Sequence, residues 1–131
     1  MNAPTVRSGF QSVVPYLAIQ RAAQLVDFLV AAFGAQHTYR SPSGTHFEVR
    51  IGNSMLMIGE VGEGASKPAQ LFMYVEDARA QYSRALKAGG TSLMEPCDKP
   101  WGDDGELMIG AGVKEPADNL WFLAGPKSNP G

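Results

Sequence analysis

The sequence predicts one α+β domain of two tandem βαβββ modules, which form a curved mixed sheet with a concave cleft. Two observations predict this fold. An apolar strand, an amphipathic helix and three further strands follow one another twice along the 131 residues. Equivalent positions of the two halves are also separated by a constant number of residues. Ile19 and Val75, which close the first strands, are 75 − 19 = 56 residues apart. Gly34 and Gly90, which follow the helices, are likewise 90 − 34 = 56 residues apart. Clefts between repeated halves are favoured places for small ligands.

In the first module, an apolar stretch at 13–19 predicts a strand, and Pro15 indicates its start or a sheet edge. Helical spacing of apolar residues predicts a helix over 21–33, ended by Gly34. Residues 1–11 are predicted to be a loose polar arm. Turn residues separate three more predicted strands, at 36–40, 46–51 and 55–58.

In the second module, an apolar strand at 71–75 precedes a helix that Asp77 caps and Gly89-Gly90 ends. The remaining predicted strands are 91–95, 107–113 and 120–124, with nine extra residues in a loop around 96–105. The whole chain, 1–131, is therefore predicted to be one domain. Its parts are module one at about 12–60, a glycine-rich linker at about 61–69, module two at about 70–125, and a tail at 126–131.

Composition restricts the function classes. With 44% hydrophobic and 18% charged residues, the chain can fill one ordinary core. The net charge of −2, without a lysine or arginine cluster, argues against nucleic acid and against an anionic membrane surface as partners. No apolar run approaches the roughly 20 residues that span a bilayer. Cys97 is the only cysteine, which excludes an internal disulfide and favours a cytoplasmic location.

Several segments together resemble a known family. They are Val14-Pro15-Tyr16-Leu17, Asp27-Phe28, Ala32-Phe33-Gly34-Ala35, the run from His46 to Met57, Tyr74-Val75-Glu76-Asp77, Trp101-Gly102-Asp103, and Glu115-Pro116 followed by Trp121. In this order they resemble a bacterial glyoxalase-like branch of the vicinal oxygen chelate superfamily. The superfamily includes glyoxalases, extradiol dioxygenases, epimerases, fosfomycin-modifying enzymes and metal-free bleomycin-binding proteins. The resemblance implies the fold above and a homodimer, but it leaves the activity open.

The resemblance also implies where a metal site would be. In the metal-using members, His, Gln or Glu from the first and last strands of each module hold an ion that acts as a Lewis acid. These positions fall on Val14, Met57, Gln70 and Phe122 of this sequence. Three of the four side chains are apolar, whereas a divalent first-row metal needs about three N, O or thiolate donors. We therefore expect no metal and no other cofactor.

The leading hypothesis is a metal-independent protein that binds an apolar or aromatic small molecule in the cleft. The expected wall consists of Val14, Tyr16, Met57, Met73, Trp101 and Phe122, with His46 and Gln70 orienting the ligand. Methionine adapts well to such walls, although core filling is the alternative interpretation of these methionines. Trp101 stacks on a flat ligand in this hypothesis, and its alternative role is to anchor a long loop.

The rival hypothesis is an enzyme. Strand alternation predicts that His46, Glu48 and Arg50 share one face, where His46 would act as a general base that Glu48 orients. The alternative is a solvent-facing strand surface. Such an enzyme would be a glyoxalase-like lyase, isomerase or dioxygenase, using His46 and Glu48 or a metal site at other positions. A third hypothesis is an interaction or regulatory module without a small ligand.

Overall fold

The structure is a computed structural model that describes residues 6–127. Module one comprises β1 (Tyr16–Ile19), α1 (Ala22–Phe33), β2 (Gln36–Arg40), β3 (His46–Ile51) and β4 (Ser54–Glu60). Module two comprises β5 (Gln70–Tyr74), α2 (Ala78–Lys87), β6 (Thr91–Lys99), a short 3₁₀ turn η1 (Asp103–Gly105), β7 (Met108–Lys114) and β8 (Leu120–Pro126). The predicted α+β fold of two tandem modules is confirmed.

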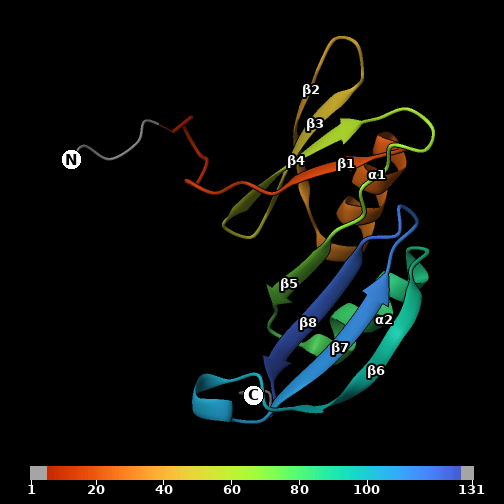
Figure 1. Ribbon diagram of the computed structural model, residues 1–131. Coiled ribbons are helices and arrows are strands. Elements are labelled where there is room, and N and C mark those ends of the chain that lie inside the picture. The colour runs from red at the N-terminus through yellow and green to blue at the C-terminus, as the bar shows by residue number, and fades with distance from the viewer. Residues whose placement is uncertain (1–5, 128–131) are drawn as a thin grey trace.

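Each module forms its own four-stranded sheet with the same strand order (Figure 1). Sheet A has the order β1-β4-β3-β2 and sheet B the order β5-β8-β7-β6. In both sheets the first and last strands of the module run parallel, and the other neighbours are antiparallel. A helix covers one face of each sheet, and we call the opposite face the outer face.

Local signals explain where the helices begin and end. The backbone N–H groups of Arg21 and Ala22 donate to the Glu60 carboxylate at the end of β4, which satisfies the first turn of α1. Gly34 ends α1 with φ 68°, a conformation that a residue without a Cβ adopts readily. The predicted cap of α2 is confirmed, because the Asp77 side chain accepts a hydrogen bond from Ala80 N–H.

The helices join the two modules. Gln81 of α2 donates a hydrogen bond to the carbonyl of Ala32, and Arg84 donates to the carbonyl of Ala31. The ring of Phe33 lies 5.1 Å from that of Trp121, which is buried on the helix side of β8. One cluster of buried side chains thus contains residues of both modules.

Several sequence predictions were wrong in detail. Strand β1 begins at Tyr16 rather than at residue 13, and β4 ends at Glu60 rather than at residue 58. Strand β6 continues to Lys99, past the predicted end at residue 95, so Pro96 lies within a strand. An edge strand with a bulge tolerates proline there because the missing N–H faces no partner strand. Strand β8 likewise runs on to Pro126, into the predicted tail.

The N-terminal arm, residues 6–15, also differs from its prediction. Residues 6–11 were predicted to be loose, but Gln11 exchanges two hydrogen bonds with the backbone of Met55, at 2.8 and 3.1 Å. The rest of the predicted arm, residues 1–5, and the predicted tail beyond 127 lie outside the described residues. Between residues 6 and 127, neither helix is long and apolar enough to cross a membrane.

Candidate functional site

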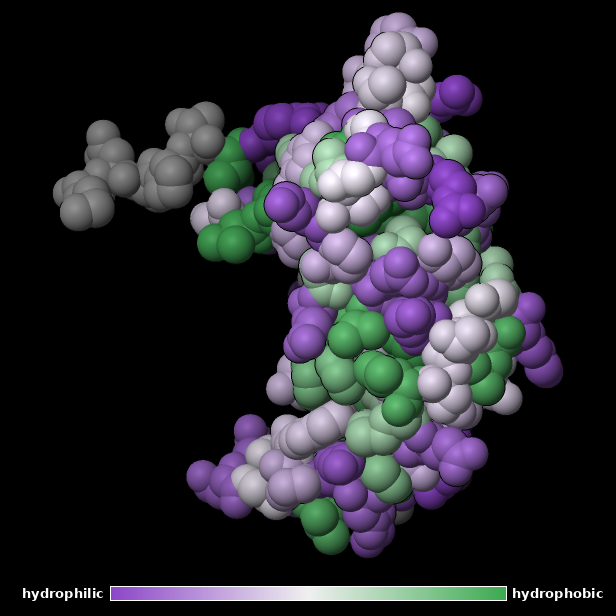
Figure 2. Space-filling model, turned by 45° about the vertical axis from the view of Figure 1, so that its right-hand side comes forward, coloured by the Kyte–Doolittle hydropathy of each residue, from purple (hydrophilic) through white to green (hydrophobic). Residues whose placement is uncertain are grey.

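One side of the molecule is hollowed, and apolar residues gather on the wall of this hollow (Figure 2). The outer faces of the two sheets differ in chemistry, although the strands that build them correspond one to one. Tyr16 pairs with Met57 in sheet A, and Phe72 pairs with Phe122 in sheet B. These pairs occupy equivalent positions of the repeat.

Sheet B carries an aromatic cluster, which we define as Phe72, Tyr74, Trp101 and Phe122. The ring of Phe72 lies 5.2 Å from that of Tyr74 and 5.3 Å from that of Trp101, and Trp101 lies 6.4 Å from Phe122. All three are edge-on contacts, an arrangement that aromatic pairs prefer. Phe72 is 47% exposed and Tyr74 is 70% exposed, so the cluster presents ring surface to solvent.

Two glycines of β7 allow the rings to lie against the sheet. A Cβ at Gly110 would stand 2.5 Å from the six-membered ring of Trp101, and one at Gly112 would stand 3.4 Å from the ring of Phe122. Trp101 therefore needs a residue without a side chain beneath it. The loop that carries Trp101 is thus fixed to the sheet, and the ring is held in place before any ligand arrives.

Sheet A carries a charged cluster, which we define as Arg7, Glu48 and His46 together with the rings of Tyr16 and Tyr39. Arg7 of the N-terminal arm donates to both carboxylate oxygens of Glu48, at 2.7 and 3.1 Å. His46 Nε2 lies 3.0 Å from Glu48 Oε2. The Tyr16 ring stacks on the imidazole of His46 at 5.8 Å, and the Tyr39 ring lies 6.2 Å from it.

Glu48 is the centre of this cluster. Its side chain is 3% exposed, so the solvent-facing alternative does not describe it. Hydrogen bonds from Arg7 lower the pKa of the Glu48 carboxyl, outweighing the opposing effect of burial, and His46 lowers it further. The carboxylate is therefore held in its charged form, with donors on two sides.

A second buried carboxylate, Glu115, has a structural place in the turn between β7 and β8. It accepts hydrogen bonds from the backbone N–H groups of Ala117 and Asn119 and from the Asn119 side chain. Burial raises the pKa of Glu115, although these hydrogen bonds oppose the shift. Asn119 in turn accepts from the backbone N–H of Ala69 at 2.8 Å, which ties the linker to this turn.

The predicted site residues fall into two groups and two outliers. Tyr16, His46 and Met57 lie on the outer face of sheet A, and Trp101 and Phe122 lie on that of sheet B. Gln70 starts β5 with the same orientation as Phe72, and it is exposed. The outliers are Val14, which precedes β1 and is half-buried, and Met73.

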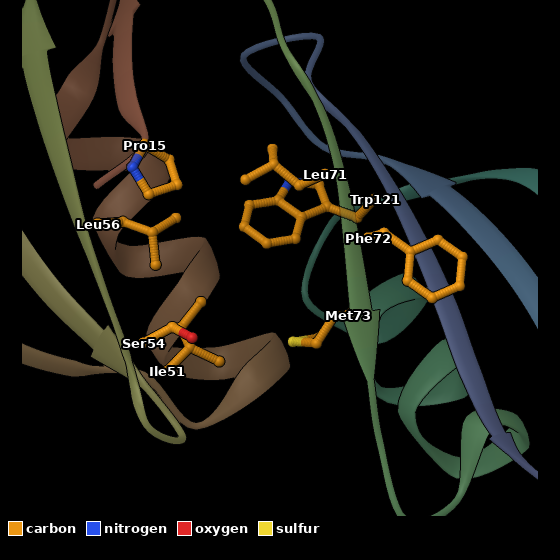
Figure 3. Close-up of a pocket in the computed structure, with 8 residues that line it drawn as sticks. All are labelled: Pro15, Ile51, Ser54, Leu56, Leu71, Phe72, Met73 and Trp121. Carbon is orange, nitrogen blue, oxygen red and sulfur yellow. The ribbon is translucent and has the colours of Figure 1, made fainter. Parts of the chain in front are cut away.

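Met73 lies on the other face of β5. It lines a pocket of about 140 Å³ between the modules, together with Leu56, Leu71 and Trp121 (Figure 3). Figure 3 shows Met73 pointing toward module one, whereas the Phe72 ring points away. Met73 and the aromatic cluster are therefore not parts of one wall.

Sequence reasoning missed Phe72, Tyr74 and Arg7. The alternation of β5 contained the signal for the two aromatic residues, since Gln70, Phe72 and Tyr74 share one face. Arg7 gave no signal, because its partner lies 41 residues away in the sequence.

Comparisons with known proteins agree with the fold. No protein-family model matches the chain. The uncharacterised protein Mb0911c of Mycobacterium bovis is 30% identical over 86% of this chain and 81% of its own length, so the two belong to one family. The crystal structure of TioX from Micromonospora sp. ML1 is 25% identical and superposes with a TM-score of 0.70 over 87% of this chain and 94% of TioX.

A glyoxalase-related enzyme from Fulvimarina pelagi, 18% identical, has a TM-score of 0.69 over 87% of this chain and 86% of its own. A glyoxalase/bleomycin resistance protein/dioxygenase family enzyme from Burkholderia phytofirmans, 16% identical, has a TM-score of 0.64 over 84% and 94%. The chain thus has the fold of these glyoxalase-related proteins, and it shares a family with the mycobacterial protein. At these identities the two enzymes establish the shared fold alone.

The metal site of the superfamily does not fit this chain's residues. Val14, Met57 and Phe122 offer no nitrogen, oxygen or thiolate donor at positions that the metal-using members fill with ligands. Within residues 6–127, no group of three or more His, Cys, Asp or Glu side chains could hold an ion.

Proposed function

We propose that this protein, which resembles the vicinal oxygen chelate superfamily in sequence and shares its fold, binds a flat, largely apolar small molecule against the aromatic cluster, without a metal. The observation that carries the proposal is the aromatic cluster itself. Trp101 is held over Gly110, the rings meet in edge-on contacts, and Phe72 and Tyr74 are exposed to solvent. Exposed apolar surface on a soluble domain often marks a place where a ligand or partner binds.

The ligand class follows from the chemistry of this surface. Aromatic rings offer offset or edge-on stacking to another ring system, with about 0.5–1.5 kcal/mol per pair beyond the burial of area. Among the predicted polar side chains, Gln70 is exposed and shares a face of β5 with Phe72, so it can orient a carbonyl or amine of the ligand. Binding of this kind involves no chemical step, so it does not require the ligands that the metal-using relatives supply.

A thermal-shift screen in the presence of EDTA tests the proposal. Flat aromatic compounds should raise the melting temperature, because a ligand of the folded state stabilises it, and chelation should not remove the shift. Metal analysis of the purified protein is the companion measurement. About one equivalent of a divalent metal, whose removal abolishes ligand binding, would replace this proposal with a metalloenzyme.

We also propose that the chain folds as one unit, acts in the cytoplasm and pairs as a homodimer. The single, half-buried Cys97 suits a reducing compartment. The homodimer follows from the family resemblance, and strand β5 lies at the edge of sheet B, where a second copy can pair with it. Analytical ultracentrifugation should give twice the monomer mass of 14.0 kDa, and a monomer at micromolar concentration would refute the pairing.

A second candidate function rests on the separation of 3.0 Å between His46 and Glu48. A buried carboxylate that orients an imidazole is an arrangement found in general-base catalysis. This would suit proton abstraction beside a carbonyl group, as in a lyase or isomerase. His46→Ala should then abolish turnover at unchanged thermal stability. A wild-type protein that binds its ligand without turning it over would exclude this role.

A further inference from the structure

The Glu48 carboxylate occupies an unusual position. It lies in β3, an inner strand of sheet A, and its neighbours in register are Tyr39 of β2 and Met57 of β4. Its side chain is 3% exposed on the outer face, away from the helix. Burial of an unpaired carboxylate is costly, so this group requires a cation or several hydrogen-bond donors beside it.

The cation comes from outside the sheet. The guanidinium of Arg7 binds the carboxylate through two parallel hydrogen bonds, at 2.7 and 3.1 Å. This two-pronged geometry is specific for planar cations such as guanidinium. Arg7 itself is 61% exposed and belongs to the N-terminal arm, which contains no helix or strand. The buried carboxylate of Glu48 is thus paired with an accessible cation, Arg7, which belongs to the N-terminal arm and not to the sheet.

Arg7 can separate from Glu48 while the rest of the arm stays attached to sheet A. Beyond Arg7 the arm is held by Gln11, whose side chain exchanges two hydrogen bonds with the backbone of Met55, and by the Pro15 carbonyl, which accepts from the Met57 N–H at 2.9 Å. Gly9 lies between Arg7 and Gln11 with φ 85°, a backbone conformation that glycine adopts readily. Phe10 follows, and the Arg7 guanidinium stands 4.5 Å over its ring. Arg7 and Phe10 therefore resemble a small ligand that carries a planar cation next to an aromatic ring.

The surroundings of Glu48 suit such a ligand. His46 donates from one side, and the rings of Tyr16 and Tyr39 flank the imidazole. Aromatic faces next to a carboxylate favour planar cations, because stacking and charge pairing act together. When Arg7 leaves, His46 alone remains as a donor to Glu48 among the contacts described for residues 6–127.

We propose that Glu48 is the centre of a binding site for a guanidinium or amidinium group, and that Arg7 fills this site in the free protein. An external ligand then competes with Arg7 for the carboxylate. Because Arg7 is tethered, it acts at an effective concentration in the millimolar range, which weakens the binding of every competitor. This site stands independently of the aromatic cluster, since a small cation needs no contact with sheet B.

The test uses benzamidine as the probe, with neutral benzamide and ring-free methylguanidinium as its counterparts. Binding is measured by isothermal titration calorimetry to the full chain and to the variants Arg7→Ala and Arg7→Lys, with Ser8→Ala as the matched control in the arm. Arg7→Ala should bind benzamidine about tenfold or more tightly than the wild type, because the internal competitor is gone. Arg7→Lys, which keeps a cation but loses the two-pronged geometry, should be intermediate, and Ser8→Ala should match the wild type.

The counterparts separate this site from the aromatic cluster. Methylguanidinium should show the same order of affinities among the variants, and benzamide should show none of the gain. Adding Glu48→Gln to Arg7→Ala should abolish the gain in affinity for benzamidine. If that double variant does not fold, the intermediate affinity expected of Arg7→Lys is the deciding measurement. Equal affinity of Arg7→Ala and wild type for benzamidine, or an equal gain for benzamide, would overturn the proposal.

Discussion

The outer faces of sheets A and B have the same topology and opposite chemistry. At equivalent positions, sheet A has Tyr16 and Met57 where sheet B has Phe72 and Phe122. Sheet A adds a buried carboxylate with a cation from the N-terminal arm across it, whereas sheet B adds Trp101 over a glycine. Both faces leave aromatic rings exposed, Tyr16 in sheet A and Tyr74 in sheet B. The repeat thus determines the framework, and the outward side chains give each half its own chemistry.

Removing the central ring of sheet B should produce the largest effect. Trp101→Ala deletes two of the three edge-on contacts in the aromatic cluster and the ring surface that we expect a ligand to stack on. Affinity for an aromatic ligand found in the thermal-shift screen should fall about tenfold. Leu107→Ala is the control, since Leu107 is 46% exposed near the same loop and makes no ring contact in the cluster. Equal losses in both variants would assign the effect to the loop rather than to the ring.

Displacing the same ring without deleting it should have a smaller effect. Gly110→Ala places a methyl group where the Trp101 ring now lies, so the ring must shift. We expect affinity to fall severalfold, with a decrease in melting temperature. Gly62→Ala is the matched control, because no atom lies within 4 Å of its added carbon and its φ is not positive. Unchanged affinity of Gly110→Ala would show that the position of Trp101 does not matter for binding.

The charged face of sheet A should respond to acid. Because Arg7 and His46 lower the pKa of Glu48 in the folded state, the unfolded chain binds more protons near pH 4.5 and below. The contribution of Glu48 to stability is thus present above 4.5 and is lost as the pH falls through the folded pKa. Glu48→Gln should flatten this part of the profile, measured by urea unfolding at a series of pH values. An identical acid slope in the variant would contradict the ion pair.

Glu115 should make stability depend on pH with the opposite sign, and this is the smallest effect that we expect. Burial raises its folded pKa above the ordinary value of 4.5, so the folded state binds more protons than the unfolded chain in that range. Its contribution to stability is therefore complete below 4.5 and is lost as the pH rises through the folded pKa. Glu115→Gln should reduce the fall in stability from pH 4.5 toward neutrality in the same unfolding series. A steeper fall in the variant would mean that the charged form is the one the turn stabilises.

The sequence predicted the framework well because periodicity reports burial. Helix α1, strand β3 and the cap at Asp77 all follow from apolar spacing and turn residues within the segment itself. The end of β6 did not follow, because Pro96 indicates a break unless the strand is known to lie at a sheet edge. That information comes only from the assembled sheet.

The candidate site was predictable only in part. Trp101 and Phe122 were found from loop composition and from the repeat, and they meet in the structure. Met73 was grouped with them, yet it lies on the opposite face of β5, where it lines the pocket between the modules. The contact of Arg7 with Glu48 was not predictable, since nothing local links an arm residue to a strand 41 positions later.

The two tryptophans allow the central claim to be tested directly. Trp101 lies in the aromatic cluster and Trp121 is buried beneath a helix, so each single Trp→Phe variant leaves one reporter. The measurement is tryptophan emission during titration with the tightest compound from the thermal-shift screen, in EDTA. The account predicts saturable quenching in Trp121→Phe, where Trp101 remains, and little change in Trp101→Phe. Quenching confined to Trp121, or binding that EDTA abolishes, would contradict it.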